Sequence, residues 1–228
     1  MKIGEKIQRK WMHLRLQPIR VYCLHHVCTS YDAETMYEGD WMALNLFQAK
    51  IKKMQQSGVV FLSLSEAYKH MRNDFFRRKK YAVLTFDDGY ASLKEVLPWL
   101  KVQHIPVTLF VNPDYACGKA YRENAKETYL TLKELSDAQV EIGMHGLQHV
   151  DATKMTSAEF RIFVEESIKA TQKIDGYIPF WAYTWGRHTS TTDSILKEQG
   201  IIPVYVDGMK NYNAATGIHR ELLYKYGN

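Results

Sequence analysis

The chain has 228 residues, 46% of them hydrophobic and 13% aromatic, so it can bury the core of one large domain. No apolar stretch approaches the length of a membrane-spanning helix, and three cysteines give no disulfide framework. The net charge is +5, but no nucleic-acid-binding motif accompanies it, so we do not expect a nucleic-acid partner.

The first twenty residues are strongly basic, with six Lys or Arg side chains against Glu5 alone. Their apolar spacing is compatible with a short amphipathic helix, which could contact a membrane surface or pack on the domain. An uninterrupted apolar core is lacking, so we expect no secretory signal and a cytoplasmic location. An extracytoplasmic location is expected instead if the chain is a processed form. We assign residues 1–18 to a basic segment and residues 19–228 to the folded domain.

Stretches with the apolar spacing of strands alternate with stretches of helical spacing. We expect strands over residues 19–27, 59–63, 81–86, 107–112, 140–144, 178–183 and 201–206. We expect helices over residues 41–57, 65–71, 91–102, 131–138, 157–175 and 191–199, with Ser65 and Thr131 as N-caps. The remaining stretches, including the tail from Met209, read as irregular. This alternation predicts parallel βαβ units, in an open doubly wound sheet or a closed barrel.

The most apolar predicted strand, residues 81–86, ends abruptly in two carboxylates, Asp87 and Asp88, and a glycine. Neighbouring strand residues point to opposite sides, so two adjacent Asp indicate that the strand ends there. His145 and residues 183–186 also follow predicted strands. In barrels, the residues that do chemistry lie at the carboxyl ends of the strands. These positions therefore favour the closed barrel.

A metal site is indicated by His145 and His149, which are four residues apart. On a tight turn this spacing brings both imidazoles within reach of one ion. The His-Glu-x-x-His pattern of metalloproteases is absent, so a carboxylate must come from elsewhere, and Asp87 or Asp88 can supply it. Two His and one carboxylate leave coordination positions open, which is typical of a catalytic metal site.

Two motifs give the chain a resemblance to the polysaccharide deacetylase family, also called the NodB-homology or carbohydrate esterase family 4 domain. Thr85-Phe-Asp-Asp-Gly-Tyr90 resembles its first motif, and His145-Gly-Leu-Gln-His149 with Val150-Asp151 resembles its second. The resemblance spans roughly residues 20–207. It implies a distorted (β/α)7-type barrel and a metal-dependent hydrolase. The substrate would be an N-acetylated amino sugar in a polysaccharide or lipid-linked glycan, with a role in building cell-surface glycans.

The resemblance also implies roles for single residues. Asp88, His145 and His149 would hold a divalent metal, most often Zn²⁺ with Co²⁺, Ni²⁺ or Mn²⁺ as alternatives. Asp87 would be the base that takes a proton from metal-activated water. Leu24-His25-His26-Val27 resembles the first-strand end in the poly-N-acetylglucosamine deacetylase branch, which implies that His25 is the general acid.

Two other histidines compete with His25 for the role of general acid. His26 ranks second, because it would point the other way on a strand. His219 is the weaker competitor, near the position where other family members carry a C-terminal acid.

The third family motif is altered in this chain. Residues 180–186 lack the Arg that orients the base in many members, and Thr184 stands where Pro is expected. This departure leaves open a catalytically weakened carbohydrate-binding protein on the same fold. A deformylase acting on a formamido sugar is a further alternative, because both reactions cleave an amide by the same route and the motifs do not separate them. Backbone amides of residues 183–186 could stabilise an oxyanion. The predicted sugar-binding residues are the aromatic side chains Tyr90, Trp181, Tyr183 and Trp185, although at least one of the last three is expected in the core.

Overall fold

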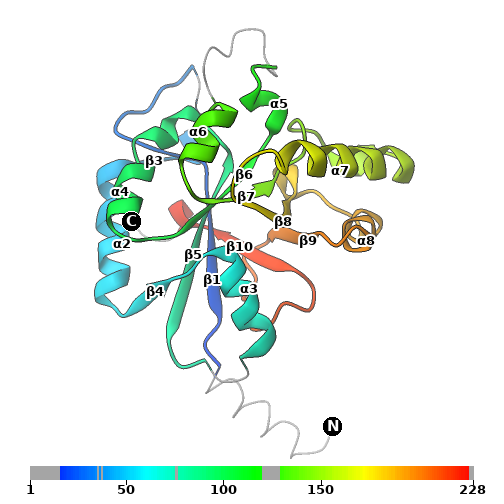
Figure 1. The fold of residues 1–228 in the computed structure, drawn as a ribbon. Helices are drawn as coiled ribbons and strands as arrows, with labels where there is room; N and C mark the ends of the chain where they lie inside the picture. Colours follow the sequence, from blue (N-terminus) through cyan, green and yellow to red (C-terminus); the bar gives the residue numbers. More distant parts are fainter. Residues whose placement is uncertain (1–15, 35, 37, 75–76, 120–128, 226–228) are drawn as a thin grey trace, which may run out of the picture.

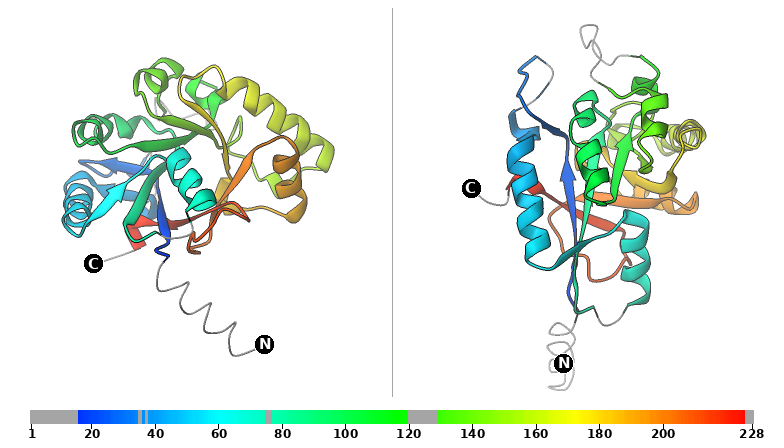
Figure 2. Two further views of the ribbon diagram at one scale, coloured as in Figure 1. Left: turned by 60° about the horizontal axis from the view of Figure 1, so that its bottom comes forward. Right: turned by 60° about the vertical axis from the view of Figure 1, so that its left-hand side comes forward.

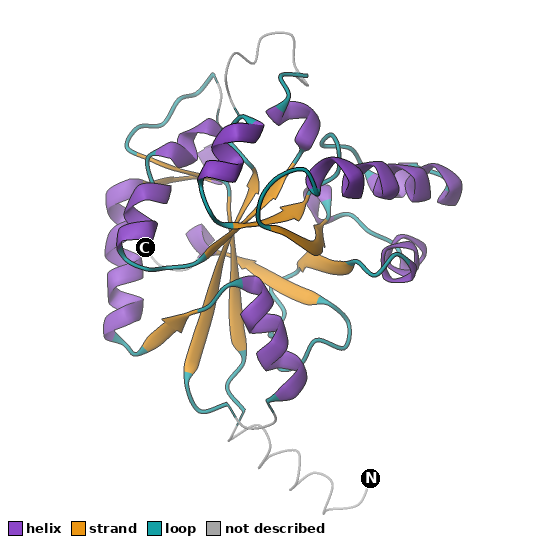
Figure 3. Ribbon diagram, viewed as in Figure 1, coloured by secondary structure: helices purple, strands orange, loops and turns teal. Residues whose placement is uncertain are grey.

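The computed structural model describes residues 16–34, 36, 38–74, 77–119 and 129–225, in which helices surround a central set of parallel strands (Figure 1, Figure 3). The amphipathic helix expected near the amino terminus, and most of the basic segment 1–18, lie outside these residues. Among the helices of the described part, none is both long and apolar enough to cross a membrane.

The predicted (β/α)7-type barrel is confirmed, because seven parallel strands close a ring. Hydrogen bonds join the strands in the order β1-β10-β9-β8-β7-β6-β5, and β1 also pairs with β5. The strands of the ring are β1 (Ile19–Leu24), β5 (Lys80–Asp88), β6 (Val107–Val111), β7 (Glu141–Met144), β8 (Tyr177–Ala182), β9 (Ile202–Val206) and β10 (Ile218–Leu222).

Two strands differ from the sequence expectation. The predicted strand at residues 59–63 exists as β4 (Val59–Phe61), but it pairs only with the start of β5 and lies outside the ring. Its place in the ring is taken by β10, in the tail that we expected to be irregular. The sequence of β10 has three consecutive polar residues, and one of them, Arg220, is fully buried. A buried arginine hides the apolar pattern that identifies a core strand.

Helices cover the outside of the ring, and α3 closes its amino-terminal end (Figure 2). The helices are α2 (Leu44–Gln56), α3 (Leu64–Asn73), α4 (Leu97–Val102), α5 (Pro113–Ala116), α6 (Leu132–Asp137), α7 (Ser157–Thr171) and α8 (Ser190–Glu198). The buried face of α3 packs against residues of the barrel interior such as Val83 and Val204. The Glu141 carboxylate accepts backbone N–H groups from Leu64 and Ser65 at the start of α3, where helices favour negative charge.

Several element boundaries differ for local reasons. The first strand bends after Leu24 and continues as β2 (His26–Cys28), which pairs with β3 (Trp41–Ala43), where we expected a helix to begin. The N-cap of α3 is Ser63, in a capping box with Glu66, rather than Ser65. The helix expected over residues 91–102 divides into a 3-10 turn and α4, since the Pro98 ring has no N–H for a continuous helix. The Thr131 cap is confirmed.

Candidate active site

Two adjacent buried carboxylates, Asp87 and Asp88, lie at the carboxyl end of β5. Asp88 has φ of +70° and Gly89 has φ of +72°, so the chain turns sharply through left-handed conformations at the last strand residue. Asp tolerates this region better than most residues, but the conformation is still uncommon and strained. The turn lets Asp88 leave the strand alternation and face the loop that follows β7.

Three ligand atoms converge beside this turn. Asp88 Oδ1 lies 3.6 Å from His145 Nε2 and 3.5 Å from His149 Nε2. Asp88 Oδ1 is buried and has no hydrogen-bond partner among the described residues, although buried polar atoms are normally paired. Tetrahedral ligands about 2.0–2.1 Å from a zinc ion lie roughly 3.4 Å apart. The three side chains therefore fit a divalent metal, and the orphaned oxygen is explained by one.

The surroundings of the two histidines suit both rings to binding a metal. His145 Nδ1 donates to the Ala182 carbonyl at 2.8 Å, which fixes the ring with Nε2 on the side of Asp88. The Asn112 side-chain amide donates to the His145 and Gly146 carbonyls and holds the loop. Burial, and secondly the neighbouring His145, lower the pKa of His149 to about 4. At neutral pH its imidazole is therefore neutral, the form that binds a metal.

The second carboxylate, Asp87, is held by a buried arginine from β10. Arg220 Nη1 lies 2.6 Å from Asp87 Oδ1, and Nη2 lies 2.8 Å from Oδ2, a bidentate pair. Burial alone would raise the pKa of Asp87, but the Arg220 guanidinium outweighs it and holds this pKa well below the ordinary value. Asp87 is therefore ionised throughout the neutral and mildly acidic range.

Arg220 is the functional residue that sequence reasoning missed. The third motif does lack an arginine, yet this guanidinium reaches the predicted base from a different strand, 133 residues away. A signal existed in the alternation of Ile218, Arg220 and Leu222, which is compatible with one face of a strand. The altered motif placed the orientation of the predicted base in doubt, and an arginine of β10 contacts that carboxylate instead.

His25 lies beside Asp87, where the strand bends out of β1. Its side chain is 19% exposed, and its Nδ1, which is buried without a hydrogen-bond partner among the described residues, lies 3.9 Å from Asp40 Oδ1. A ring nitrogen of His25, an Asp87 oxygen and Cys23 Sγ all lie within 4.8 Å of one another. Burial raises the pKa of the Cys23 thiol, and Arg220 already neutralises Asp87. These two features do not favour a second metal site at His25, Asp87 and Cys23.

The other two histidines are engaged elsewhere. His26 is buried, stacks on Tyr90 with ring centroids 3.9 Å apart, and its Nδ1 lies 2.9 Å from Ser92 Oγ. Burial, and secondly His25, lower the pKa of His26 to about 4. His219 faces away from its neighbour Arg220 and bonds Asp207 and Thr216. None of these contacts of the His26 and His219 rings involves Asp87 or Asp88.

The prediction of sugar-binding aromatic side chains is wrong for two of the four residues, Trp181 and Tyr183. Trp181 is buried against Phe160 and Phe163 of α7, and Tyr183 is buried with its hydroxyl donating to Asp193. Both rings belong to the core between the barrel and the helices, so a sugar cannot stack on them.

The amides near Tyr183 were also predicted as oxyanion donors, and two of them are already used. The Tyr183 amide donates to the Val204 carbonyl, and the Gly186 amide donates to the Tyr183 carbonyl.

The other two aromatics, Trp185 and Tyr90, flank the metal-ligand group. Trp185 is 55% exposed and meets the His149 ring edge-on, with centroids 4.6 Å apart. Arg187 lies 5.5 Å from the centre of the Trp185 ring and is itself paired with Asp151 at 2.7 Å. Tyr90 stacks on His26, as described, and on Tyr129 on its own side of the site. The exposed indole of Trp185 and the stacked phenol of Tyr90 thus border the mouth of the barrel, by which we mean the carboxyl ends of its strands around Asp88, His145 and His149.

The chain is similar to several known proteins. Residues 76–204 match the family model described as polysaccharide deacetylase. The Bacillus subtilis protein YxkH, which is named as a polysaccharide deacetylase, is 25% identical over 124 residues. That match covers 54% of this chain and 43% of YxkH, so this chain aligns with less than half of the relative.

Three solved structures share the fold. IcaB from Ammonifex degensii is 22% identical with a TM-score of 0.76, over 92% of this chain and 93% of IcaB. The Streptococcus pyogenes deacetylase PplD in complex with acetate is 24% identical with a TM-score of 0.77, over 91% of this chain and 93% of PplD. The de-N-acetylase from Aggregatibacter actinomycetemcomitans is 16% identical with a TM-score of 0.79, over 93% and 97% of the two chains.

Proposed function

Because this chain belongs to the polysaccharide deacetylase family, we propose that it is a metal-dependent hydrolase that removes N-acetyl groups from an amino sugar in a polysaccharide or lipid-linked glycan. The observation that carries the proposal is the pairing of two groups at the barrel mouth. One is the metal-ligand set of Asp88, His145 and His149, with its orphaned oxygen. The other is the arginine-clamped carboxylate of Asp87, with His25 beside it.

The metal would be held by Asp88, His145 and His149. When bound, a divalent ion such as Zn²⁺ supplies an acidified water and a Lewis acid for the amide carbonyl. Asp87 acts as the general base and removes a proton from the attacking water. Arg220 fixes the carboxylate plane and keeps it ionised, so no reorganisation is needed when the proton arrives.

The amine leaving group needs a proton, because an amide anion is a very poor leaving group. His25 would donate it, which is supported by the short distance of at most 4.8 Å between its ring nitrogen and an Asp87 oxygen. The Asp40 carboxylate, 3.9 Å from His25 Nδ1, would stabilise the protonated imidazole before the transfer. The exposed face of Trp185 and the stacked ring of Tyr90 would hold the sugar on either side of the reacting amide.

Acetate release tests this function. The purified protein is incubated with N-acetylglucosamine oligomers and with nucleotide- or lipid-linked N-acetyl sugars, with and without a chelator. We expect one bound transition metal per chain, acetate release that the chelator abolishes, and recovery on adding Zn²⁺ back. Release that survives complete metal removal contradicts the mechanism. Formate release from a formamido sugar, with no acetate from any substrate, would identify a deformylase. Glycan binding without turnover would identify a carbohydrate-binding protein.

A further inference from the structure

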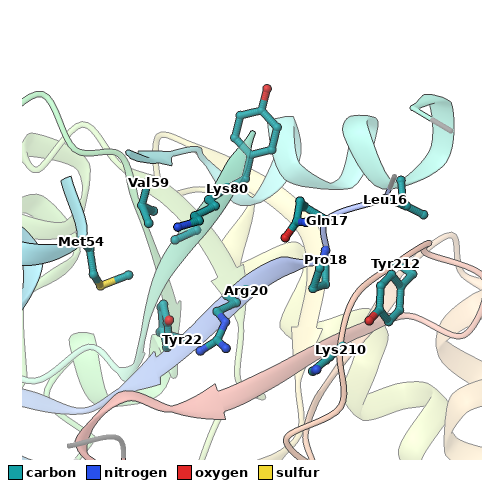
Figure 4. A pocket seen from close by; sticks show the side chains of 12 residues that line it. Leu16, Gln17, Pro18, Arg20, Tyr22, Met54, Val59, Lys80, Lys210 and Tyr212 are labelled. Carbon is teal, nitrogen blue, oxygen red and sulfur yellow. The ribbon is translucent and has the colours of Figure 1, made fainter. Parts of the chain in front are cut away.

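A cavity lies at the opposite end of the barrel from the candidate active site. It has a volume of about 500 Å³ and is lined by residues from the beginnings of β1 and β5, the end of α2 and the loop after β9 (Figure 4). β5 begins at Lys80, which lines this cavity, and ends at Asp88 in the active site. Eight residue steps along a strand span roughly 26 Å. A ligand in this cavity would therefore not touch the catalytic residues.

The cavity is positively charged. Its lining contains the basic residues Arg20, Lys80 and Lys210 and no Asp or Glu. Arg20 lies between the two lysines in Figure 4 and has a carboxylate neighbour, Glu221, at 3.4 Å. Lys80 and Lys210 are exposed and have no ion pair within the described residues. The exposed Arg78 and Lys79 directly precede Lys80 in the chain. This excess of cations in a concave surface favours an anionic ligand.

One side of the same cavity is apolar. Met54 at the end of α2, Val59 at the start of β4, and the ring of Tyr22 line it next to Lys80 (Figure 4). Leu16 and Pro18 line the side where the described chain enters β1. An inorganic anion would gain nothing from these surfaces, whereas a ligand with both a charged group and a hydrocarbon part would use both halves.

The walls of the cavity are fixed by a buried arginine. Arg77 donates to the carbonyls of Gln17 and Tyr212, two lining residues, and to those of His70 and Asp74 at the end of α3. The Gln17 amide donates back to the Arg77 carbonyl at 2.8 Å. The segment before β1 and the loop after β9 are thus tied together without a ligand. A site that is already ordered loses little entropy on binding.

We propose that this cavity binds the phosphate headgroup of an anionic membrane lipid, so that the amino-terminal end of the barrel rests on the membrane and the active-site mouth faces away. The lysines and Arg20 would contact the phosphate, and the apolar side would contact the glycerol and the first acyl carbons. Basic residues beside an anionic bilayer each contribute to attraction that salt weakens.

Vesicle sedimentation tests the proposal and needs no enzymatic turnover, so its failure is independent of the deacetylase function. We expect the full chain to bind vesicles of phosphatidylglycerol and phosphatidylcholine, and to bind pure phosphatidylcholine vesicles much more weakly. The double variant Lys80→Gln, Lys210→Gln should have an about 30-fold lower partition coefficient, from the usual contribution of two basic residues. The matched control is Lys169→Gln, Lys197→Gln, two exposed lysines on α7 and α8, which should bind as the wild type.

Three outcomes overturn the proposal. Equal losses in the two double variants would show non-specific charge attraction. Unchanged binding in the cavity variant would place the membrane contact elsewhere. Displacement from vesicles by low millimolar inorganic phosphate, at constant ionic strength, would identify a site for free phosphate. An unchanged melting temperature in both double variants excludes misfolding as the cause of any loss.

Discussion

The two ends of the barrel each contain a buried arginine, and the two arginines do different work. Arg220 at the mouth pairs with a carboxylate, Asp87. Arg77 at the opposite end is also buried, but its described hydrogen bonds all go to backbone carbonyls. Burial would lower the pKa of Arg220, but Asp87 raises it above its ordinary value, whereas burial lowers the pKa of Arg77.

The difference shows that the role of a buried arginine depends on whether its partner can bind a proton. An arginine lowers the pKa of a carboxylate partner and so determines the pH range in which that carboxylate can accept a proton. Carbonyl partners do not titrate, so Arg77 can only hold segments together. The comparison therefore predicts that changes at the mouth alter catalysis, while changes at the other end alter stability.

The largest effect is expected from removing the charge of the base. Asp87→Asn should lower kcat by about 10²- to 10⁴-fold, the usual contribution of a general base. Metal content should stay at the wild-type value, since Asp87 is outside the proposed ligand set. Metal analysis and acetate release on the same sample check both points. If Asp87→Asn keeps more than a tenth of wild-type kcat, Asp87 is not the general base. The pairing of Arg220 with Asp87 would then have no catalytic role to set it apart from the contacts of Arg77.

Arg220→Met should have the next largest effect and should also change the pH profile. With the guanidinium gone, burial dominates and raises the pKa of Asp87, so the acid limb of kcat/KM should move to higher pH. The contribution of Asp87 to the pH dependence of the free energy of unfolding should also change sign. In the wild type, the depressed pKa gives stability that is lost only as the pH falls below about 4. In the variant, stability should be lost as the pH rises through the raised pKa.

The size of the Arg220→Met effect can be measured at fixed pH. Leaving Asp87 as an unpaired buried charge should cost about 3–5 kcal/mol in the free energy of unfolding at pH 7. Denaturant titration at pH 5 and pH 7 measures it. Arg220→Lys is the control, since it keeps the charge and should keep the acid limb nearer to the wild-type position. An acid limb that stays in place in Arg220→Met would show that Asp87 is not the titrating base.

Arg77→Met should reduce stability and leave kcat unchanged. The substitution leaves buried carbonyls unpaired, and each such group costs about 1–3 kcal/mol. Thermal melting and kcat, measured well below the melting temperature, separate the two effects. A fall in kcat in a fully folded sample would show that the two ends of the barrel are coupled.

The smallest effect is expected at the rim. Trp185→Ala should raise KM about fivefold to tenfold and change kcat less than twofold, since a stacked ring contributes roughly 1 kcal/mol. Arg187→Gln, which removes the cation beside that ring but keeps the ring, should have a smaller effect of the same kind. A large fall in kcat in Trp185→Ala would instead place the indole at the reacting atoms.

Sequence patterns predicted the barrel, and they pointed to three side chains, Asp88, His145 and His149, that the fold brings together. The aspartates and the two histidines were singled out because they come after apolar strands, which are readable from composition. The choice of Asp88 over Asp87 as the metal ligand came from the family resemblance. Arg220 was not found, because a charged residue inside a barrel strand contradicts the pattern that identifies strands. Trp181 and Tyr183 were misassigned, because an aromatic ring at a strand end can face either the mouth or a covering helix, and only packing decides.

The position of β10 has a consequence for the order in which the protein matures. Asp87 precedes its arginine by 133 residues, and β10 must enter between β1 and β9 before the ring is complete. A ribosome adds about 5–20 residues per second, so the carboxylate is synthesised roughly 7 to 27 seconds before the guanidinium. In a nascent chain, Asp87 would therefore lack its counter-charge until β10 is inserted. Insertion of this single late strand would close the ring of strands and form the Asp87–Arg220 pair in one event.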